Sequence, residues 1–468
     1  MSLRRLAAGC LVPSFIGPAR PDWLRPWLED GLGGVCLFAT NVRDPEQLAA
    51  LTASLREGGP GLLVALDEEG GDVTRLEVAQ GSSYPSALGL GVVDDVDLTE
   101  AVAAAIAAEL AAVGVNLNLA PVADVNTNPD NPVIGIRAFG SVPELVARHV
   151  AAFVRGTQRA GVAACAKHFP GHGDTRQDSH HELPTVEAPE LEPFRAAVEA
   201  GVRAVMTAHV VVRSLGPDPA TVSPAAMRLL REELGFEGLV VTDALDMRAV
   251  AGTIGVEESA VRALEAGVDA LCLGPAIGPD GVAAVRDAIV AAVDSGRLTE
   301  ERVAEAAARV GACGSEPQSP VPDRAIGSEA ARRALLVRGD VDPGERPRVV
   351  ELLPEPSMAA GHTGASFLRE LQARLPGASA DGDGRVVLVV RDLERQPRLR
   401  QAATAVLERH PDAIVVETGV PGWAPPGATA VVVTHGGGRA SLAAAADALA
   451  QVSAASSASS RSTSSGVL

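Results

Sequence analysis

The sequence predicts an α/β protein, a (β/α)8 barrel of the TIM type followed by a smaller α/β domain. Two observations carry this prediction. Short apolar, β-branched runs alternate with alanine-rich helical stretches over about the first 300 residues, a length that suits eight strand–helix units. Chemically reactive polar residues directly follow several of these runs, where a barrel places its catalytic groups.

Eight runs are expected to form the barrel strands, because each is short, β-branched and followed by a turn signal. They are Cys10–Ile16, Gly34–Phe38, Leu62–Leu66, Asn116–Ala120, Val162–Ala166, Ala204–Thr207, Leu239–Thr242 and Ala270–Leu273. Helices are expected between them at Leu98–Val113, Pro143–Ala160, Leu191–Ala200, Pro224–Leu234 and Val256–Ala266. Continuous apolar strands that alternate with helices indicate a parallel sheet covered on both faces. An open doubly wound sheet is the alternative, but no Gly-x-Gly-x-x-Gly fingerprint follows the first strand, so nothing indicates a dinucleotide cofactor.

The first run also has features of a targeting signal. Two arginines precede an apolar stretch that ends near Cys10, as in a secretion or lipoprotein signal. Because Pro13 and Pro18 break the stretch, we interpret it as a buried strand.

The chain divides into four segments. We expect a catalytic barrel domain over residues 1–311 and a proline-containing linker over 312–325. Residues 326–451 are expected to form the second α/β domain. Its strands are expected at Arg348–Leu353, Arg385–Val390, Ala413–Val416 and Ala428–Thr434. Residues 452–468 are mostly serine and alanine and are expected to be a disordered tail.

Composition excludes several classes of partner. The 40 basic and 59 acidic residues give a formal net charge of −19, which disfavours binding to nucleic acid or to an anionic membrane. No apolar run approaches the ~18 residues of a membrane span. The five cysteines are scattered and odd in number, which fits a reducing cytoplasm better than a disulfide framework. The oligomeric state is left open.

Polar residues end five consecutive barrel strands, and parallel strands bring such ends to one rim. These residues are Asp67, Asp124, the pair Lys167 and His168, His209, and Asp243. Lys167 is the one lysine among 40 basic residues, the others being arginine. We infer that a compact ammonium is required at this position, where the planar fork of arginine would not serve.

Four of the nine histidines lie within residues 168–181. Metal binding is one interpretation, but glycine and proline break any helix here and the spacings do not place ligands on one face. We therefore predict no metal and no cofactor. The alternative is a mobile loop that carries a general acid/base, because Asp178 can orient the imidazole of His180 two residues away.

These motifs together resemble the bacterial β-N-acetylhexosaminidases of glycoside hydrolase family 3. Lys-His-Phe-Pro-Gly-His-Gly at 167–173, followed by Asp-Ser-His at 178–180, is similar to the family signature. Leu-Asp-Glu-Glu-Gly-Gly at 66–71 with Arg75, and Asn-Pro-Val-Ile-Gly-Ile-Arg at 131–137, resemble its substrate-binding segments. Val-Met-Thr-Ala-His at 205–209 resembles its sixth strand, and Val-Thr-Asp-Ala-Leu-Asp-Met at 241–247 resembles its nucleophile motif. Asp72 stands where the family commonly has a basic residue.

The resemblance implies a retaining double displacement that releases terminal N-acetylglucosamine (GlcNAc) from cell-wall fragments or chito-oligosaccharides. Asp243 would be the nucleophile, with Asp246 as the nearby rival. His180 paired with Asp178 would be the acid/base in place of the second carboxylate of most retaining enzymes. The sugar ligands would be Asp67, Arg75, Arg137, Lys167 and His168.

Two other functions stay open. One is a phosphorylase on the same scaffold, since a neutral histidine repels an incoming phosphate less than a carboxylate does. The other is a non-catalytic sugar-binding protein, although such a protein is expected to lack the nucleophile or the loop.

Overall fold

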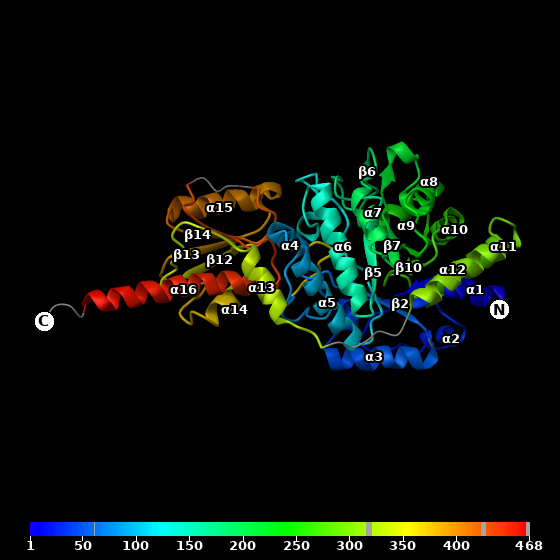
Figure 1. Cartoon of the computed structure of the whole chain (residues 1–468), viewed down its shortest axis with the longest axis horizontal. Coiled ribbons are helices and arrows are strands. Elements are labelled where there is room, and N and C mark those ends of the chain that lie inside the picture. The colour runs from blue at the N-terminus through cyan, green and yellow to red at the C-terminus, as the bar shows by residue number, and fades with distance from the viewer. Residues whose placement is uncertain (60, 315–320, 423–426, 465–468) are drawn as a thin grey trace. The chain divides into compact units, whose positions relative to one another are not determined.

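Eight parallel strands alternate with helices in the first unit of the protein (Figure 1). The structure is a computed structural model that describes residues 1–59, 61–314, 321–422 and 427–464. Two compact units are present. The first comprises Met1–Glu69, Asp94–Ile134 and Ala138–Asp323, and the second comprises Gly70–Val93, Gly135–Arg137 and Arg324–Leu468.

Eight strands of the first unit follow one another around the barrel in chain order. They are β1 (Leu11–Pro13), β2 (Gly34–Leu37), β3 (Leu63–Leu66), β4 (Leu117–Asn118), β5 (Ala163–Phe169), β7 (Ala204–Thr207), β9 (Leu239–Thr242) and β10 (Leu271–Leu273). Strands β2, β3, β4, β5, β7 and β9 form one parallel sheet, a bridge between Val241 and Ala270 continues it towards β10, and β10 pairs in parallel with β1. The short strands β6 (Thr185–Val186) and β8 (Val211–Val212) form a separate two-stranded parallel sheet. Strand β1 lies against β2. The predicted barrel and its eight strands are therefore confirmed.

Alternate residues of these strands fill the barrel interior. Its core includes Val12, Cys36, Leu117, Cys165 and Met206, which are all buried. All five cysteines are buried free thiols.

Helices cover the outside of the barrel. They are α1 (Leu3–Gly9), α2 (Leu24–Glu29), α3 (Pro45–Gly58), α5 (Val96–Ala112), α6 (Pro143–Arg159), α7 (Glu192–Glu199), α8 (Pro224–Arg228), α9 (Arg248–Ala251), α10 (Val256–Ala266), α11 (Pro279–Asp294) and α12 (Glu300–Cys313). In several of these helices the N-cap side chain accepts a hydrogen bond from a backbone N–H of the first turn. Asp44 accepts from the backbone N–H of Gln47 at 2.7 Å, and Asp95 accepts from that of Leu98 at 3.1 Å. The expected helix over 224–234 changes at Leu229 into a π-helical turn over Leu229–Glu233.

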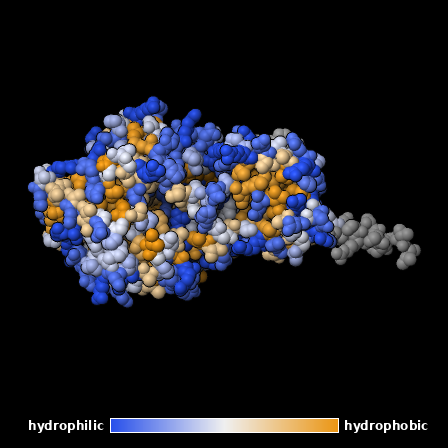
Figure 2. All heavy atoms as spheres, turned by 180° about the vertical axis from the view of Figure 1, so that it is seen from behind, coloured by the Kyte–Doolittle hydropathy of each residue, from blue (hydrophilic) through white to orange (hydrophobic). Residues whose placement is uncertain are grey.

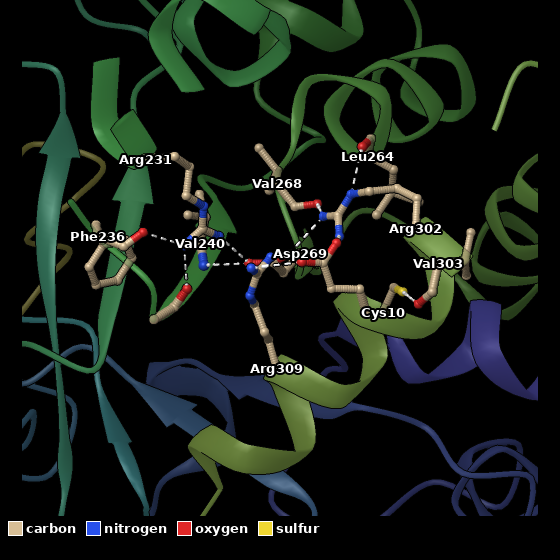
Figure 3. A network of polar contacts seen from close by, with 12 residues as sticks. Cys10, Arg231, Phe236, Val240, Leu264, Val268, Asp269, Arg302, Val303 and Arg309 are labelled. Carbon is tan, nitrogen blue, oxygen red and sulfur yellow. Dashed lines mark hydrogen bonds and ion pairs between the residues drawn. The ribbon is translucent and has the colours of Figure 1, made fainter. Parts of the chain in front are cut away.

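A buried carboxylate joins the helices to the N-terminal side of β10. Asp269 is fully buried, and its two oxygens accept from Arg231 and Arg302 at 2.7 Å each and from Arg309 at 3.1 Å (Figure 3). Arg302 and Arg309 lie on α12, and Arg231 lies in the π-helical turn. Three arginine side chains thus bind one carboxylate, and two of these ion pairs hold helix α12 against the barrel.

We predict that Asp269→Ala destabilises the protein by about 3–5 kcal/mol, because it leaves three guanidinium groups without their shared anion. Denaturant unfolding measures this loss. Asp287→Ala is the control, since the ion pairs of Asp287 are surface-exposed and are expected to contribute less than about 1 kcal/mol. Equal effects of the two substitutions would contradict the structural role of Asp269.

The second unit is an open five-stranded sheet with strand order β11-β15-β14-β13-β12. Strands β12 (Arg348–Leu352), β13 (Val386–Val390), β14 (Ile414–Glu417) and β15 (Ala430–Val433) are parallel and match the predicted strands. Strand β11 (Leu336–Arg338) is antiparallel and was not predicted from the sequence. The helices of this unit are α4 (Ala87–Val93), α13 (Ala325–Ala334), α14 (Phe367–Gln372), α15 (Pro397–Arg409) and α16 (Arg439–Ser464).

The structure differs from the predicted segments at residues 70–93, at residues 135–137 and in the C-terminal tail. Residues 70–93 and 135–137, predicted to belong to the barrel domain, join the second unit. The predicted linker falls partly on residues 315–320, which lie outside the described residues. Helix α16 continues to Ser464 through most of the predicted tail.

Glu417 is a buried carboxyl group at the end of β14. Its Oε1 accepts from the backbone N–H groups of Asp392 and Gly419, at 3.1 and 2.8 Å. Burial raises the pKa of Glu417 from 4.5 to about 7. Between these values the unfolded chain is ionised while the folded chain keeps its proton, so stability falls as the pH rises.

We predict that raising the pH from 4.5 to above 7 removes about 3 kcal/mol of stability through Glu417. Glu417→Gln keeps the acceptor oxygen and is expected to abolish this contribution. Denaturant midpoints at pH 5 and pH 8 measure it, with the exposed Glu351→Gln as the matched control. A similar pH dependence in the Glu417→Gln variant and the wild type would contradict the assignment.

No helix among the described residues is long and apolar enough to span a membrane. Hydrophilic side chains cover much of the face seen in Figure 2, with hydrophobic patches between them.

Candidate active site

The carboxyl ends of the barrel strands gather the reactive residues of the first unit. Asp67 directly follows β3, His209 follows β7 after one residue, and Asp243 directly follows β9. Lys167 and His168 lie in β5, which extends three residues beyond its predicted end. The parallel strands therefore place these side chains at one rim of the barrel.

Lys167 is buried between two carboxylates. Its Nζ lies 2.7 Å from Oδ1 of Asp67 and 2.7 Å from Oε1 of Glu69, and its side chain is 2% exposed. A small ammonium can donate to two acceptors from one point, which a guanidinium of fixed plane cannot do in the same space. Glu69 was missed by the sequence analysis, although it lies within a motif on which the family resemblance rests.

Asp124 holds the residues of β5 and the loop after it. Its Oδ2 accepts from His168 Nδ1 at 2.7 Å, and its Oδ1 accepts from the backbone N–H of His172 at 2.6 Å. Asp124 is fully buried. It was noted as a strand-end residue, but its bonds to two separate residues could not be read from the sequence.

Asp243 is half-buried, and its Oδ1 accepts from the backbone N–H of Ala244 at 2.8 Å. Burial alone would raise the pKa of Asp243, but the imidazoles of His209, His168 and His180 outweigh it and hold the pKa below the ordinary value of 3.8. Asp243 is therefore an ionised carboxylate at neutral pH.

His209 supports the same segment from β7. Its Nε2 donates to the carbonyl oxygen of Ala244 at 3.0 Å, and its Nδ1 lies 2.7 Å from Oγ1 of Thr221. Burial lowers the pKa of His209. Ala244, the residue after Asp243, thus has both its backbone N–H and its backbone C=O hydrogen-bonded.

Asp178 and His180 form the predicted pair. Oδ1 of Asp178 accepts from His180 Nδ1 at 2.6 Å and from the backbone N–H of His180 at 2.9 Å. Burial opposes the charge on Asp178, but the hydrogen bond from His180 prevails and lowers the pKa of the carboxyl group. The His180 side chain is 23% exposed.

Asp246, the rival carboxylate, has a different environment. It accepts from the backbone N–H of Ala276 at 3.2 Å in the loop after β10, and burial raises its pKa. It lies beside Gly274.

Arg75, Arg137 and Asp72 belong to the second unit. Arg75 donates to the carbonyl oxygens of Ala359 and Ala360 at 2.7 and 3.1 Å, and Arg137 is buried in a short 3-10 turn. Asp72 pairs with Arg391 and accepts from the backbone N–H of Gly437 at 2.8 Å. The acidic residue that departs from the family pattern thus has a cationic partner within its own unit.

Among the described residues, no group of three or more His, Cys, Asp and Glu side chains has a geometry suited to a metal ion.

A parallel barrel with an ionised carboxylate and a carboxylate-paired imidazole at its strand ends is the architecture of an enzyme with a strand-end active site. Residues 23–312 match the family described as the glycosyl hydrolase family 3 N-terminal domain. The chain belongs to glycosyl hydrolase family 3.

Relatives and solved structures agree with this family. The chain is 38% identical to beta-hexosaminidase A of Pseudoalteromonas piscicida over 269 residues, a match that spans 51% of this chain and 45% of that protein. It is 38% identical to a beta-hexosaminidase of Xylella fastidiosa over 56% of this chain and 82% of the relative. A family 3 β-N-acetylglucosaminidase from Paenibacillus superposes with a TM-score of 0.86 at 32% identity and covers 97% of both chains.

We predict that Lys167→Arg lowers kcat/KM about a hundredfold although it keeps the charge, because the longer, planar group displaces Asp67 or Glu69 by about 1 Å. Steady-state kinetics on a chromogenic glycoside measure this, and thermal unfolding checks the fold. Near-normal kinetics would mean that the lone lysine is an accident of composition.

Proposed function

We propose that the protein is a retaining exo-β-N-acetylglucosaminidase that releases terminal non-reducing GlcNAc from cell-wall fragments or chito-oligosaccharides. The observation that carries the proposal is the presence of an ionised Asp243 and a carboxylate-paired His180 at one end of the barrel. The named activities of the β-hexosaminidase relatives and of the Paenibacillus structure support the sugar. The cytoplasmic location stays a prediction.

In the first step a carboxylate oxygen of Asp243 attacks the anomeric carbon as the glycosidic C–O bond breaks. The electron pair of that bond goes to the leaving oxygen, which takes a proton from His180 Nε2. Asp178 stabilises the imidazolium that gives this proton and fixes which nitrogen faces the substrate, because it holds Nδ1.

In the second step His180 takes a proton from water, whose oxygen attacks the anomeric carbon. The ester bond to Asp243 breaks, and the carboxylate is restored. Two displacements at one carbon retain its configuration.

We assign sugar binding to Asp67, Arg75, Arg137, Lys167 and His168. Asp67 accepts from sugar hydroxyls while Lys167 holds its carboxylate in place, and His168 is oriented by Asp124. The two arginines are assigned to the hydroxyl and acetamido groups on the strength of the family resemblance.

The activity is tested with aryl β-glycosides of GlcNAc and of glucose, each assayed with and without phosphate. We expect faster turnover of the GlcNAc substrate, with no phosphate requirement and with GlcNAc as the released sugar. A requirement for phosphate and a sugar phosphate product would instead establish a phosphorylase.

We predict that Asp243→Asn lowers kcat at least about a thousandfold, since an amide cannot form the glycosyl ester. Asp246→Asn is the matched control, because it lies nearby and keeps an oxygen acceptor for Ala276. A 5-fluoro N-acetylglucosaminyl fluoride is expected to label the peptide around Asp243 in a mass spectrum. Labelling at Asp246 would overturn the assignment.

A further inference from the structure

The segment that carries Asp178 and His180 is attached to the barrel through the residue between them. Ser179 is 3% exposed, and its Oγ lies 3.1 Å from Nε2 of His172. The side chains on either side bond to each other, whereas Ser179 bonds to a buried imidazole.

His172 is itself firmly held. Its backbone N–H donates to Asp124 at 2.6 Å, and its carbonyl oxygen accepts from Asn131 Nδ2 at 2.9 Å. Its ring Nδ1 lies 2.8 Å from Oγ1 of Thr175. Both the main chain and the ring of His172 therefore have fixed partners before Ser179 is considered.

The ring of His172 is neutral at the pH at which cells work. Burial lowers the pKa of His172 to about 4, against an opposing effect of Asp124. A neutral imidazole has one donor and one acceptor nitrogen, and Thr175 and Ser179 provide a hydroxyl for each. His172 thus has the properties of a fixed attachment point and not those of a proton carrier.

We propose that His172 is a positioning residue whose hydrogen bond to Ser179 acts as a latch that sets the place of His180 over the anomeric carbon. This inference rests on the proposed function, because it assumes that His180 transfers the proton. Without the latch, the Asp178–His180 pair stays intact but its segment loses the hydrogen bond to the buried ring of His172. The loss is expected to fall on proton transfer and to leave sugar binding largely unaffected.

The test uses Ser179→Ala in the full chain, with His180→Ala for reference. On chitobiose, whose leaving group needs a proton, we expect kcat/KM to fall about a hundredfold, the cost of misplacing a catalytic group by ~1 Å. On an aryl β-N-acetylglucosaminide with an acidic phenol, we expect a loss below about threefold, because that phenol leaves without a proton. Azide is expected to raise kcat on the aryl substrate by replacing the water that His180 no longer activates.

Thr127→Ala is the matched control. Oγ1 of Thr127 donates to Asp174 of the same loop at 3.1 Å, but at an exposed position. We expect neither the difference between substrates nor the azide effect in this variant.

Two substitutions of His172 separate the latch from general packing. The amide of His172→Gln can reach the place of Nε2 and bond to Ser179, whereas that of His172→Asn reaches only the place of Nδ1. We expect His172→Gln to recover most of the chitobiose activity and His172→Asn to behave like Ser179→Ala. Equal losses on both substrates in Ser179→Ala and His172→Asn would overturn the latch and leave the proposed function standing. Failure of the wild type to release GlcNAc from either substrate would remove the proposed function itself.

Discussion

The carboxylate of Asp124 is the contact on which the arrangement of the site depends. It is fully buried at the carboxyl end of the barrel, and it accepts from the imidazole of His168 and from the backbone of His172. The carboxylate of Asp124 therefore orients His168, a candidate sugar ligand, and holds the backbone at the beginning of the loop that carries His180. An unpaired carboxylate at this depth would be costly, so its ring and backbone donors are required partners.

The two ends of the barrel use buried carboxylates differently. On the N-terminal side of β10, Asp269 meets three arginines, and these strong, directional contacts fix helix α12. At the carboxyl end, the fully buried Asp124 pairs with His168, and in the following loop the half-buried Asp178 pairs with His180. The arginines around Asp269 are permanently charged and suit a structural contact, whereas a histidine side chain can donate or accept a proton in catalysis.

Much of the fold could be predicted from the sequence, because eight apolar runs with turn signals mark the strands of a sheet buried on both faces. Strand β11 could not, since it is three residues long, exposed and antiparallel. The association of residues 70–93 with the second unit was also missed. Contacts such as that of Asp72 with Arg391 join residues more than 300 positions apart, and local pattern says nothing about them. In the site, the residues at the strand ends could be predicted. The roles of Glu69 and His172 could not, because they depend on contacts with Lys167 and Ser179 that only the folded structure shows.

The lone lysine shows how composition and geometry can be combined. In a chain with 39 arginines, one ammonium is buried, and it bridges Asp67 and Glu69 with two bonds of 2.7 Å. The donation of Lys167 to a sugar hydroxyl stays a prediction. Its ammonium also fixes two acceptor groups, one of which is a proposed sugar ligand, and offsets part of their charge. Two adjacent carboxylates would otherwise repel each other and favour protonation of one of them. An ion too large for the gap would lose this balance even though it carried the same charge.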